Sequence, residues 1–309
     1  MNFISKIIDK LFLKQWSFGI SNQSIEDIIS NKKMEQKFNW FPITNKYQFY
    51  ADPFLFRSLN NQYYVLYEDY NYKEQYGKIS ICALDQYNKP VSSKTVLDTN
   101  SHLSYPGVFM EDQHIYVFPE AGASGKLSCY YYDDITKSLV FKSDIINLPL
   151  TDATVLKYNK KYWIFSTMKG ENSNNQLYIF YSDTLLGPYT SHPKNPVKNE
   201  INGSRPAGNF ISVANQVYRP SQNSDKYYGS SISIYKIIQL DENDFKEEFY
   251  MSILPAKKGR FNFGLHTINH VDNLIVIDGL SKSFLPITQL MTYIRKKLKK
   301  SGNIDKNLK

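Results

Sequence analysis

Apolar and aromatic residues gather along the chain in short paired runs. Each pair has a small or polar start, a first apolar run, a brief turn, and a second apolar run that ends in polar residues. The first pair begins at Ala51, and its second run spans residues 64–68. Four further pairs follow, so that the five starts lie near residues 52, 105, 152, 206 and 266. Runs of this length bounded by turn residues predict β-strands.

Further strand-like runs separate the pairs, among them residues 77–81 and 125–129, which are nearly the same in sequence. Each unit therefore holds three or four strands in about fifty residues, the period expected of propeller blades. We predict an all-β fold, a five-bladed β-propeller. The alternative is a β-sandwich whose hairpins are alike by chance. We expect the fifth blade to take a strand from the region before Asp52, so that both ends of the chain close the ring.

Apolar residues recur at helical spacing near both termini. They do so over residues 1–14, with lysines to one side, and again over residues 286–300. The predicted organisation is an N-terminal amphipathic helix over 1–14, a propeller over 15–282, and a basic amphipathic helix and tail over 283–309.

The net charge of +8 arises mostly at the C-terminus, where residues 281–309 hold eight basic residues and a single acidic one, Asp305. The remainder of the chain is near neutral, so nucleic acid is not expected as a partner. Two interpretations of the basic end stay open. It is either a helix packed on the propeller with a solvated charged end, or, with the N-terminal helix, an anchor to an anionic membrane surface.

Several kinds of site are not predicted. Cys82 and Cys129 lie in strand-like runs and lack the spacing of a disulfide framework or of metal ligands. A glycine-rich phosphate loop is not found either, so we expect neither a metal nor a cofactor. The apolar runs fall short of the roughly 18 to 20 residues that span a bilayer. We expect a cytoplasmic protein, and peripheral attachment to the inner face of the membrane stays open together with the anchor interpretation of the termini.

In a propeller, equivalent positions of distant repeats become neighbours around one axis. The five starts should therefore bring together Asp52, Tyr105, Asp152, Arg205 and His266. The second strands of the units add Glu68, Glu120, Arg219, Gln222 and Asp278 nearby. Among these residues, the candidates for binding substrate are Arg205, Arg219, His266, Tyr105, Glu68, Gln222 and Asp278.

These residue types suit chemistry on sugars. Paired carboxylates can activate a nucleophile and protonate a leaving oxygen, so Asp52 and Asp152 are candidate catalytic residues with Glu120 as a candidate acid. Arg205 and Arg219 suit a phosphate or carboxylate group. The structural alternative is that the acids cap turns and the arginines neutralise them.

The motifs also carry a family resemblance. They are Ala51-Asp52-Pro53, Pro119-Glu120, Thr151-Asp152-Ala153-Thr154, Arg205-Pro206-Ala207-Gly208, Tyr218-Arg219-Pro220-Ser221-Gln222 and His266-Thr267. The Ala51-Asp52-Pro53 start, the segment Tyr181-Ser182-Asp183-Thr184-Leu185-Leu186-Gly187-Pro188-Tyr189 and the five-unit period resemble five-bladed propellers of family 43 glycoside hydrolases. The whole series, over about residues 15–282, is more similar still to the propeller module at the N-terminus of glucosamine inositolphosphorylceramide transferases and to its bacterial surface-polysaccharide relatives.

The resemblance implies that Asp52 matches the hydrolases' catalytic base and Asp152 their orienting acid. The chain departs from the hydrolases in the fourth unit, where Arg205 and Arg219 stand in place of a general-acid glutamate, which argues against ordinary hydrolysis. We expect glycosyl transfer from a phosphate-activated donor to a surface polysaccharide or a lipid-linked acceptor. A glycoside hydrolase or phosphorylase of the same fold, and a non-catalytic carbohydrate-binding propeller, remain as alternatives.

Overall fold

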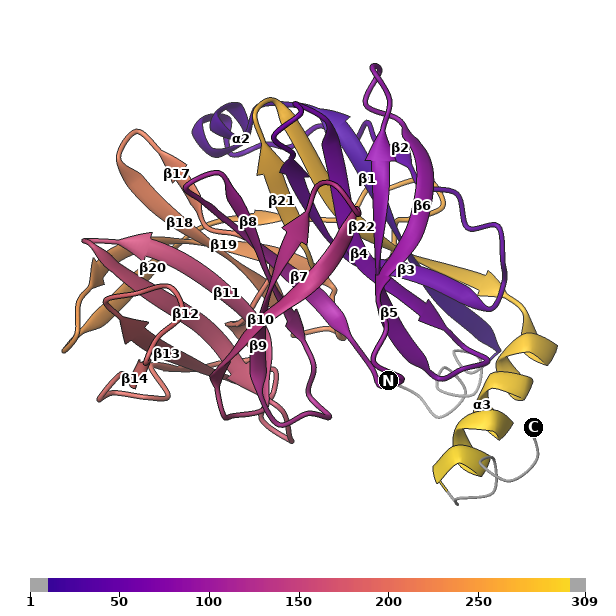
Figure 1. Cartoon of the computed structure of the whole chain (residues 1–309). Coiled ribbons are helices and arrows are strands. Elements are labelled where there is room, and N and C mark those ends of the chain that lie inside the picture. The colour runs from indigo at the N-terminus through magenta and orange to yellow at the C-terminus, as the bar shows by residue number, and fades with distance from the viewer. Residues whose placement is uncertain (1–10, 301–309) are drawn as a thin grey trace.

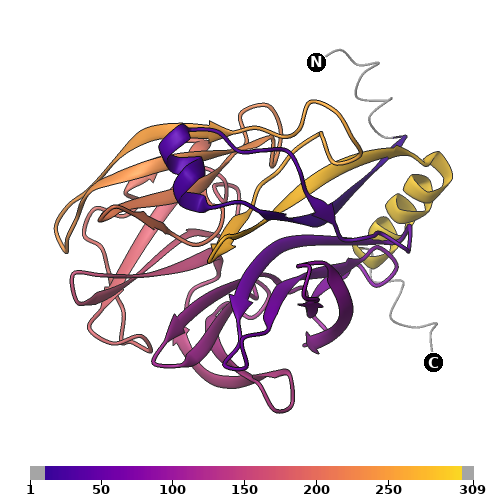
Figure 2. The same ribbon diagram turned by 90° about the horizontal axis from the view of Figure 1, so that it is seen from above.

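Five β-sheets arranged around a common axis form the body of the protein (Figures 1 and 2). The structure is a computed structural model that describes residues 11–300. Four of the sheets follow one another along the chain, and the fifth combines strands from both ends. The prediction of a five-bladed β-propeller is confirmed.

The first four blades each begin with an inner strand and proceed outward. Blade 1 consists of β3 (Gln48–Arg57), β4 (Tyr63–Asn71), β5 (Tyr76–Leu84) and β6 (Pro90–Leu97). Blade 2 consists of β7 (Ser104–Glu111), β8 (His114–Glu120), β9 (Leu127–Asp133) and β10 (Ser138–Ile146). Blade 3 consists of β11 (Leu150–Tyr158), β12 (Lys161–Met168), β13 (Gln176–Ser182), β14 (Thr190–Ser191) and β15 (Lys198–Asn199). Blade 4 consists of β16 (Asn202–Pro206), β17 (Ile211–Val213), β18 (Gln216–Asn223), β19 (Ser231–Leu240) and β20 (Phe245–Ile253).

The fifth blade closes the ring with both ends of the chain. Its strands are, from the axis outward, β21 (Ile268–Val271), β22 (Leu274–Phe284), β1 (Phe12–Asn22) and β2 (Asn39–Trp40). β1 pairs antiparallel with β22 along its whole length, from Phe12 opposite Phe284 to Asn22 opposite Leu274. The expected closure by a strand from before Asp52 is therefore confirmed.

The terminal helices differ in how far the structure describes them. The helix predicted over residues 1–14 lies mostly outside the described residues, and its last three positions, 12–14, belong to β1 rather than to a helix. Helix α3 (Pro286–Lys300) follows β22 where a C-terminal helix was predicted. A further short helix, α2 (Ile25–Asn31), follows β1. Within residues 11–300, the helices are too short and too polar to cross a membrane.

The hydrophobic core is divided among the interfaces between neighbouring blades. Phe54 and Leu66 of blade 1 pack with Val117 of blade 2 in one of these layers. Equivalent layers join blades 2 and 3, 3 and 4, 4 and 5, and 5 and 1, with α2 completing the layer between blades 4 and 5. Cys82 and Cys129 are buried as free thiols within these layers. Because every blade packs against two others, the apolar area buried between the blades stabilises the ring as one unit.

The inner strands of blades 1, 2 and 3 share an irregularity at equivalent positions. Their pairing shifts register at residues 51–54, 104–107 and 151–154. The residues at the shifts, Asp52, Tyr105 and Asp152, have φ angles of 50°, 40° and 53°. A β-bulge with a left-handed residue redirects side chains and adds strain that surrounding contacts must hold. The three bulges therefore lie at the same height along the propeller axis.

The propeller has two different ends. The inner strands begin, and their partner strands finish, at the end where α3 also begins, and we call this the site end. Hairpin turns such as residues 112–113 and 241–244 lie at the opposite end, which we call the far end. Figure 1 shows α3 at the lower end of the molecule and α2 at the upper end.

Candidate functional site

Most of the predicted site residues meet around the axis, toward the site end. We call Asp52, Glu68, Tyr105, Glu120, Asp152, Arg205, Gln222, His266 and Asp278 the axial cluster. Asp52, Asp152, His266 and Asp278 are all buried. Arg205 retains 15% exposure of its side chain, and Glu120 is partly exposed. Arg205 and Glu120 therefore form an edge of the cluster that faces solvent, and we call this edge its entrance.

Carboxylates of the cluster bind the bulge amides from one blade to the next. Asp278 of blade 5 accepts from the N–H of Asp52 at 3.4 Å, and Asp52 accepts from the N–H of Tyr105 in blade 2 at 3.3 Å. Glu120 of blade 2 accepts from the N–H of Asp152 in blade 3 at 3.3 Å. The acids thus satisfy backbone donors that the bulges leave without a strand partner. They hold neighbouring blades in register at the axis.

Asp52 is at the centre of a buried group with a histidine. Its Oδ1 accepts from the Thr267 hydroxyl at 3.0 Å and lies 3.5 Å from Nε2 of His266. The other ring nitrogen of His266 binds Asp278, and the ring stacks on Trp16 of β1 at 4.1 Å between centroids. The closing strand therefore fixes the orientation of the imidazole that faces Asp52.

Asp152 is held by blade 4. Nε of Arg205 donates to its Oδ2 at 2.6 Å, and the side-chain amide of Gln222 donates to the same oxygen at 2.8 Å. Nη1 of Arg205 donates to Asn174 at 3.1 Å, and its guanidinium lies 5.2 Å from the ring of Tyr228. Tyr228 is 42% exposed, so this edge of the cluster faces solvent.

Tyr105 is fully buried and joins blade 2 to blades 3 and 4. Its hydroxyl lies 2.8 Å from the Thr154 hydroxyl and accepts from the N–H of Gly208 at 2.7 Å. Gly208 has a φ of 122°, and a Cβ there would lie 1.9 Å from the carbonyl oxygen of Ile268. The phenol was predicted to bind substrate, but the structure shows it in contact with protein groups.

The environment raises the pKa of several carboxyls in the cluster. Burial raises the pKa of Asp52 to about 6, although His266 acts in the opposite direction. Burial and the neighbouring Asp152 raise the pKa of Glu120 to about 8. Burial also raises the pKa of Glu68 well above its ordinary value. Burial lowers the pKa of His266, but Asp278 and Asp52 more than offset this, so the pKa is raised.

The differences among these pKa values allow the acids to take different roles near neutral pH. Asp52 can accept a proton, since its pKa of about 6 places much of it in the ionised form. Glu120, with a pKa of about 8, is largely protonated and can donate. Asp152 forms its ion pair with Arg205. A base, an acid and a cation therefore share one site.

Arg219 lies apart from the axial cluster. Its guanidinium donates to both carboxylate oxygens of Glu247, at 2.8 and 2.6 Å, and Lys198 binds the same carboxylate at 2.9 Å. Arg219 is 1% exposed. It is three residues from Gln222 on β18, and positions an odd number apart point to opposite faces of a strand. The expected pairing of Arg205 with Arg219 around one anion is not what the structure shows.

Three residues of the cluster could face a single metal ion. The ligand atoms of Asp52, His266 and Asp278 lie within 4.8 Å of one another. Asp278 already accepts from the N–H groups of His266 and Thr267, at 2.8 and 3.1 Å, and binds the His266 ring. These contacts describe a hydrogen-bonded Asp-His-Asp arrangement.

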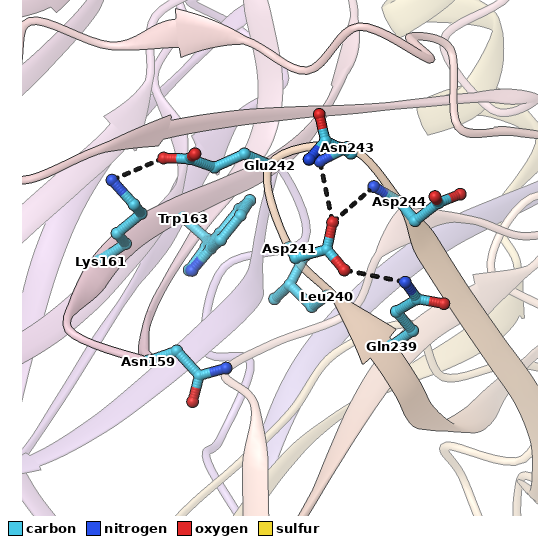
Figure 3. A pocket seen from close by; sticks show the side chains of 9 residues that line it. All are labelled: Asn159, Lys161, Trp163, Gln239, Leu240, Asp241, Glu242, Asn243 and Asp244. Carbon is cyan, nitrogen blue, oxygen red and sulfur yellow. Dashed lines mark hydrogen bonds and ion pairs between the residues drawn. The ribbon is translucent and has the colours of Figure 1, made fainter.

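A surface cavity of about 480 Å³ lies between blades 3 and 4 at the far end (Figure 3). Its charged groups are engaged with one another: Lys161 binds Glu242, and Asp241 accepts from Gln239 and from two backbone N–H groups of its own turn. Such contacts form a self-satisfied turn. The axial cluster therefore remains the candidate functional site.

Sequence reasoning missed three residues that shape the site. Trp16 stacks on His266, Asn174 accepts from Arg205, and Tyr228 lies against both Arg205 and His266. All three lie outside the repeated strand pair, so the repeat contained no signal for them. Trp16 could have been found from the expected closure of blade 5, which brings β1 beside β22.

The chain matches one family model and curated relatives of the same name. The family model described as glucosamine inositolphosphorylceramide transferase 1, N-terminal, matches residues 41–281. The transferase of that name from Oryza sativa subsp. japonica is 30% identical over 231 residues, which are 72% of this chain and 31% of the relative. The one from Arabidopsis thaliana is 27% identical over 281 residues, covering 83% of this chain and 37% of the relative. The chain thus spans about a third of the length of these relatives.

Solved structures with a similar fold are glycoside hydrolases. Zg3597, a family 117 glycoside hydrolase of Zobellia galactanivorans, superposes with a TM-score of 0.56 at 13% identity and covers 89% of this chain and 92% of its own. An exo-β-1,3-galactanase of Phanerochaete chrysosporium has a TM-score of 0.52 at 11% identity, over 72% and 57%. At such identities the likeness shows the fold alone. The family match over residues 41–281 is what places the sequence: the chain belongs to the family of the N-terminal domain of glucosamine inositolphosphorylceramide transferase 1.

Proposed function

We propose that the axial cluster transfers a glycosyl group from a phosphate-bearing donor to an acceptor hydroxyl in glycolipid or surface-polysaccharide assembly. The observation that carries this proposal is the combination of a carboxyl whose pKa is near 6, Asp52, with one whose pKa is near 8, Glu120, and an arginine, all at one level of the axis. The relatives' name, glucosamine inositolphosphorylceramide transferase, supports the class of reaction.

In the proposed reaction, Asp52 takes the proton of the acceptor hydroxyl. The acceptor oxygen attacks the anomeric carbon as the bond from that carbon to the phosphate oxygen breaks, and the phosphate leaves with the bonding electron pair. Arg205 offsets the negative charge of the leaving group, because its guanidinium is charged at every relevant pH. Glu120 donates a hydrogen bond or its proton to the departing oxygen.

The contacts of Asp52 assign supporting roles. His266 lies between Asp52 and Asp278, so both carboxylates affect whether its ring is protonated. A protonated ring favours the ionised form of Asp52. The Asp152 and Gln222 pair orients Arg205 rather than touching the donor. Arg219 has no role in the proposed reaction, since Glu247 engages it within blade 4.

The proposal predicts a bell-shaped pH dependence of kcat/KM. The ascending limb should follow ionisation of Asp52, near pH 6, and the descending limb loss of the Glu120 proton, near pH 8. Glu120→Gln should remove the descending limb and lower the rate by roughly 10²-fold, the typical contribution of a general acid. The measurement is donor consumption in the presence of acceptor across this range.

The central test is Asp52→Asn. Asp52 has a positive φ, which asparagine adopts readily. The two contacts use different carboxylate oxygens, so the amide oxygen can still accept from the N–H of Tyr105 while the amide nitrogen donates to the Thr267 hydroxyl. Transfer should fall by 10²-fold or more while the thermal transition stays in place. Asp69→Asn, at a partly buried aspartate of β4 outside the cluster, is the matched control and should keep full activity. Full transfer by Asp52→Asn would rule out Asp52 as the base.

A second function, carbohydrate binding without turnover, is favoured by one observation. The cluster carboxylates accept from backbone N–H groups at three blade junctions, which is a structural use of the same residues. In that case sugar binding would survive Asp52→Asn with no turnover of any phosphorylated donor. Release of free sugar from oligosaccharides without a phosphorylated donor would instead identify a hydrolase.

A further inference from the structure

Helix α3 packs on the propeller with its polar face. Thr288 and Thr292, one turn apart, are 4% and 7% exposed, and Arg295 lies over the ring of Tyr47 at 5.8 Å. The apolar stripe points away from the body. Its members and the adjoining aromatic residues are exposed: Ile287 79%, Leu290 58%, Met291 43%, Tyr293 55%, Ile294 41% and Phe284 62%. The helix thus packs on the propeller through its threonines and leaves its apolar stripe exposed.

The stripe lies at the site end of the propeller. Helix α3 begins two residues after β22 ends, and β22 contributes Asp278 to the axial cluster. Tyr47, which contacts the helix, directly precedes β3, the strand of Asp52. Partly exposed aromatic side chains of other loops also lie at this end, among them Tyr227, Tyr228 and Phe263. An apolar surface thus adjoins the entrance to the cluster.

Charge divides between the two ends. The hairpin turns of the far end hold the acids Asp85, Asp112, Asp134, Asp183, Asp241, Glu242, Asp244 and Asp272, with the bases Lys89, Lys137 and Lys160. The loops of the site end hold the bases Lys46, Lys73, Lys126, Lys169, Lys226, Lys257, Lys258 and Arg260, with the acids Glu74, Asp98, Glu171, Glu200 and Asp225. Helix α3 adds further basic residues, including Lys296 and Lys297, and has no acid. At the far end, Arg57, Lys161 and Lys194 also pair with acids of these turns, so the far end is close to neutral and the site end is the more positive of the two.

We infer that the site end docks on an anionic lipid surface through α3, with the entrance to the axial cluster turned toward the bilayer. Apolar side chains beside lysines bind a membrane interface by area and by charge together. The far end lacks this excess of positive charge, so the charge difference between the ends orients the propeller as well as attracting it. The cytoplasmic leaflet is the natural anionic surface of this kind.

A second copy of the chain fits the stripe less well than a lipid surface does. A two-fold contact through α3 would place one basic helix against another, because each copy presents the same patch and α3 has no acid to pair with Lys296 and Lys297. Like charges at such a contact oppose association, whereas anionic headgroups neutralise them. The docking does not depend on catalysis and is tested without it.

The experiment is co-sedimentation of the full chain with vesicles of phosphatidylcholine alone, or of phosphatidylcholine mixed with phosphatidylserine. We expect binding to the mixed vesicles only, and its loss at about 1 M salt, where charges are screened within roughly 3 Å. Lys296→Glu with Lys297→Glu should weaken binding by at least 25-fold, about five-fold for each lysine removed. Ile287→Ser with Ile294→Ser should weaken it by at least ten-fold, since buried apolar area is lost.

Two controls match these variants in chemistry but lie at the far end. Lys89→Glu changes the same charge in the β5–β6 turn, and Ile135→Ser removes an isoleucine that is 92% exposed. Both should bind vesicles as the parent chain does. Unchanged binding by the α3 variants, or equal weakening by the controls, would overturn the proposal. So would a parent chain that is dimeric by light scattering and becomes monomeric only in the α3 variants, since a second copy would then occupy the stripe.

Discussion

Single residues of the axial cluster serve the fold and the candidate chemistry together. Asp52 and Glu120 accept from backbone N–H groups of the next blade, and both have a raised pKa. A buried carboxyl that accepts a hydrogen bond can hold its place in either protonation state. Its charge can therefore change near neutral pH while the blades stay joined.

Glu120 should make the stability of the protein depend on pH. Its pKa rises from 4.5 in the unfolded chain to about 8 in the folded protein, so folding favours the protonated form. The contribution of Glu120 to the free energy of unfolding is therefore fully present below about pH 4.5, and it is lost as the pH rises through about 8. Glu120→Gln should therefore raise the free energy of unfolding at pH 8.5 relative to the parent, by about 1 kcal/mol or more, with less effect at pH 5.

Denaturant unfolding at the two pH values measures this difference. Glu171→Gln, at an exposed position in the loop between β12 and β13, is the control and should leave the pH dependence as it is. If Glu120→Gln and the parent chain lose the same stability between pH 5 and pH 8.5, the carboxyl of Glu120 ionises without cost in the folded protein.

At the scale of the element, a buried ion network that is separate from the site lies in blade 4 and reaches β15 of blade 3. Arg219 on β18 and Lys198 on β15 both bind Glu247 on β20, so the network ties the inner part of the blade to its outer edge. Arg219 also donates to the carbonyl of Gly203 in β16. The short strands β16 and β17 pair with β18 over only a few residues each. The ion network therefore supplies contacts in this blade that strand pairing does not.

Arg219→Met should destabilise the protein without changing the reaction. Removing one partner leaves Glu247 buried with its charge only partly matched, at a cost of about 3 to 5 kcal/mol. Arg57→Met, which loses the exposed pair with Asp272, should cost less than about 1 kcal/mol. Both variants should keep the parent kcat/KM per folded molecule. A large rise in KM for Arg219→Met at parental stability would show instead that Arg219 binds substrate.

The whole molecule depends on the strand that closes the ring. β1 pairs with β22 over 11 residues and supplies Phe18, which is fully buried between blades 5 and 1 and stacks on Phe41 at 4.7 Å. Trp16 of the same strand covers His266. Closure of the ring and construction of the site therefore depend on one element.

Phe18→Ala should lower the free energy of unfolding by about 3 to 5 kcal/mol, because it opens a cavity between two blades. Deletion of residues 1–22 should abolish cooperative thermal unfolding, since it exposes the edge of β22. Phe249→Ala on β20, where the ring is 58% exposed, should stay within about 0.5 kcal/mol of the parent. Calorimetry distinguishes these outcomes, and a cooperative transition at the parental temperature in the deletion variant would contradict the role given to β1.

The repeated strand pair determined the number of blades, the order of the strands and the meeting of Asp52, Asp152, Arg205 and His266. It could do so because strand length and turn residues are local properties, and a ring places equivalent positions together. The same repeat predicted that both chain ends would share the fifth blade. The family resemblance assigned roles to Asp52 and Asp152, and the structure places these two residues at bulges of the axis.

Only the tertiary structure decided which way individual side chains face. Arg219 was grouped with Arg205 because both lie in the fourth unit, yet β18 turns it toward Glu247 and away from the axis. The three bulges, and the pKa values that follow from burial, depend on groups contributed by neighbouring blades. Helix α3 was predicted from the helical spacing of its apolar residues. That spacing is the same whichever face of the helix packs on the propeller. The choice to bury Thr288 and Thr292, and to leave the apolar stripe outside, came from the shape of the propeller surface against which the helix lies.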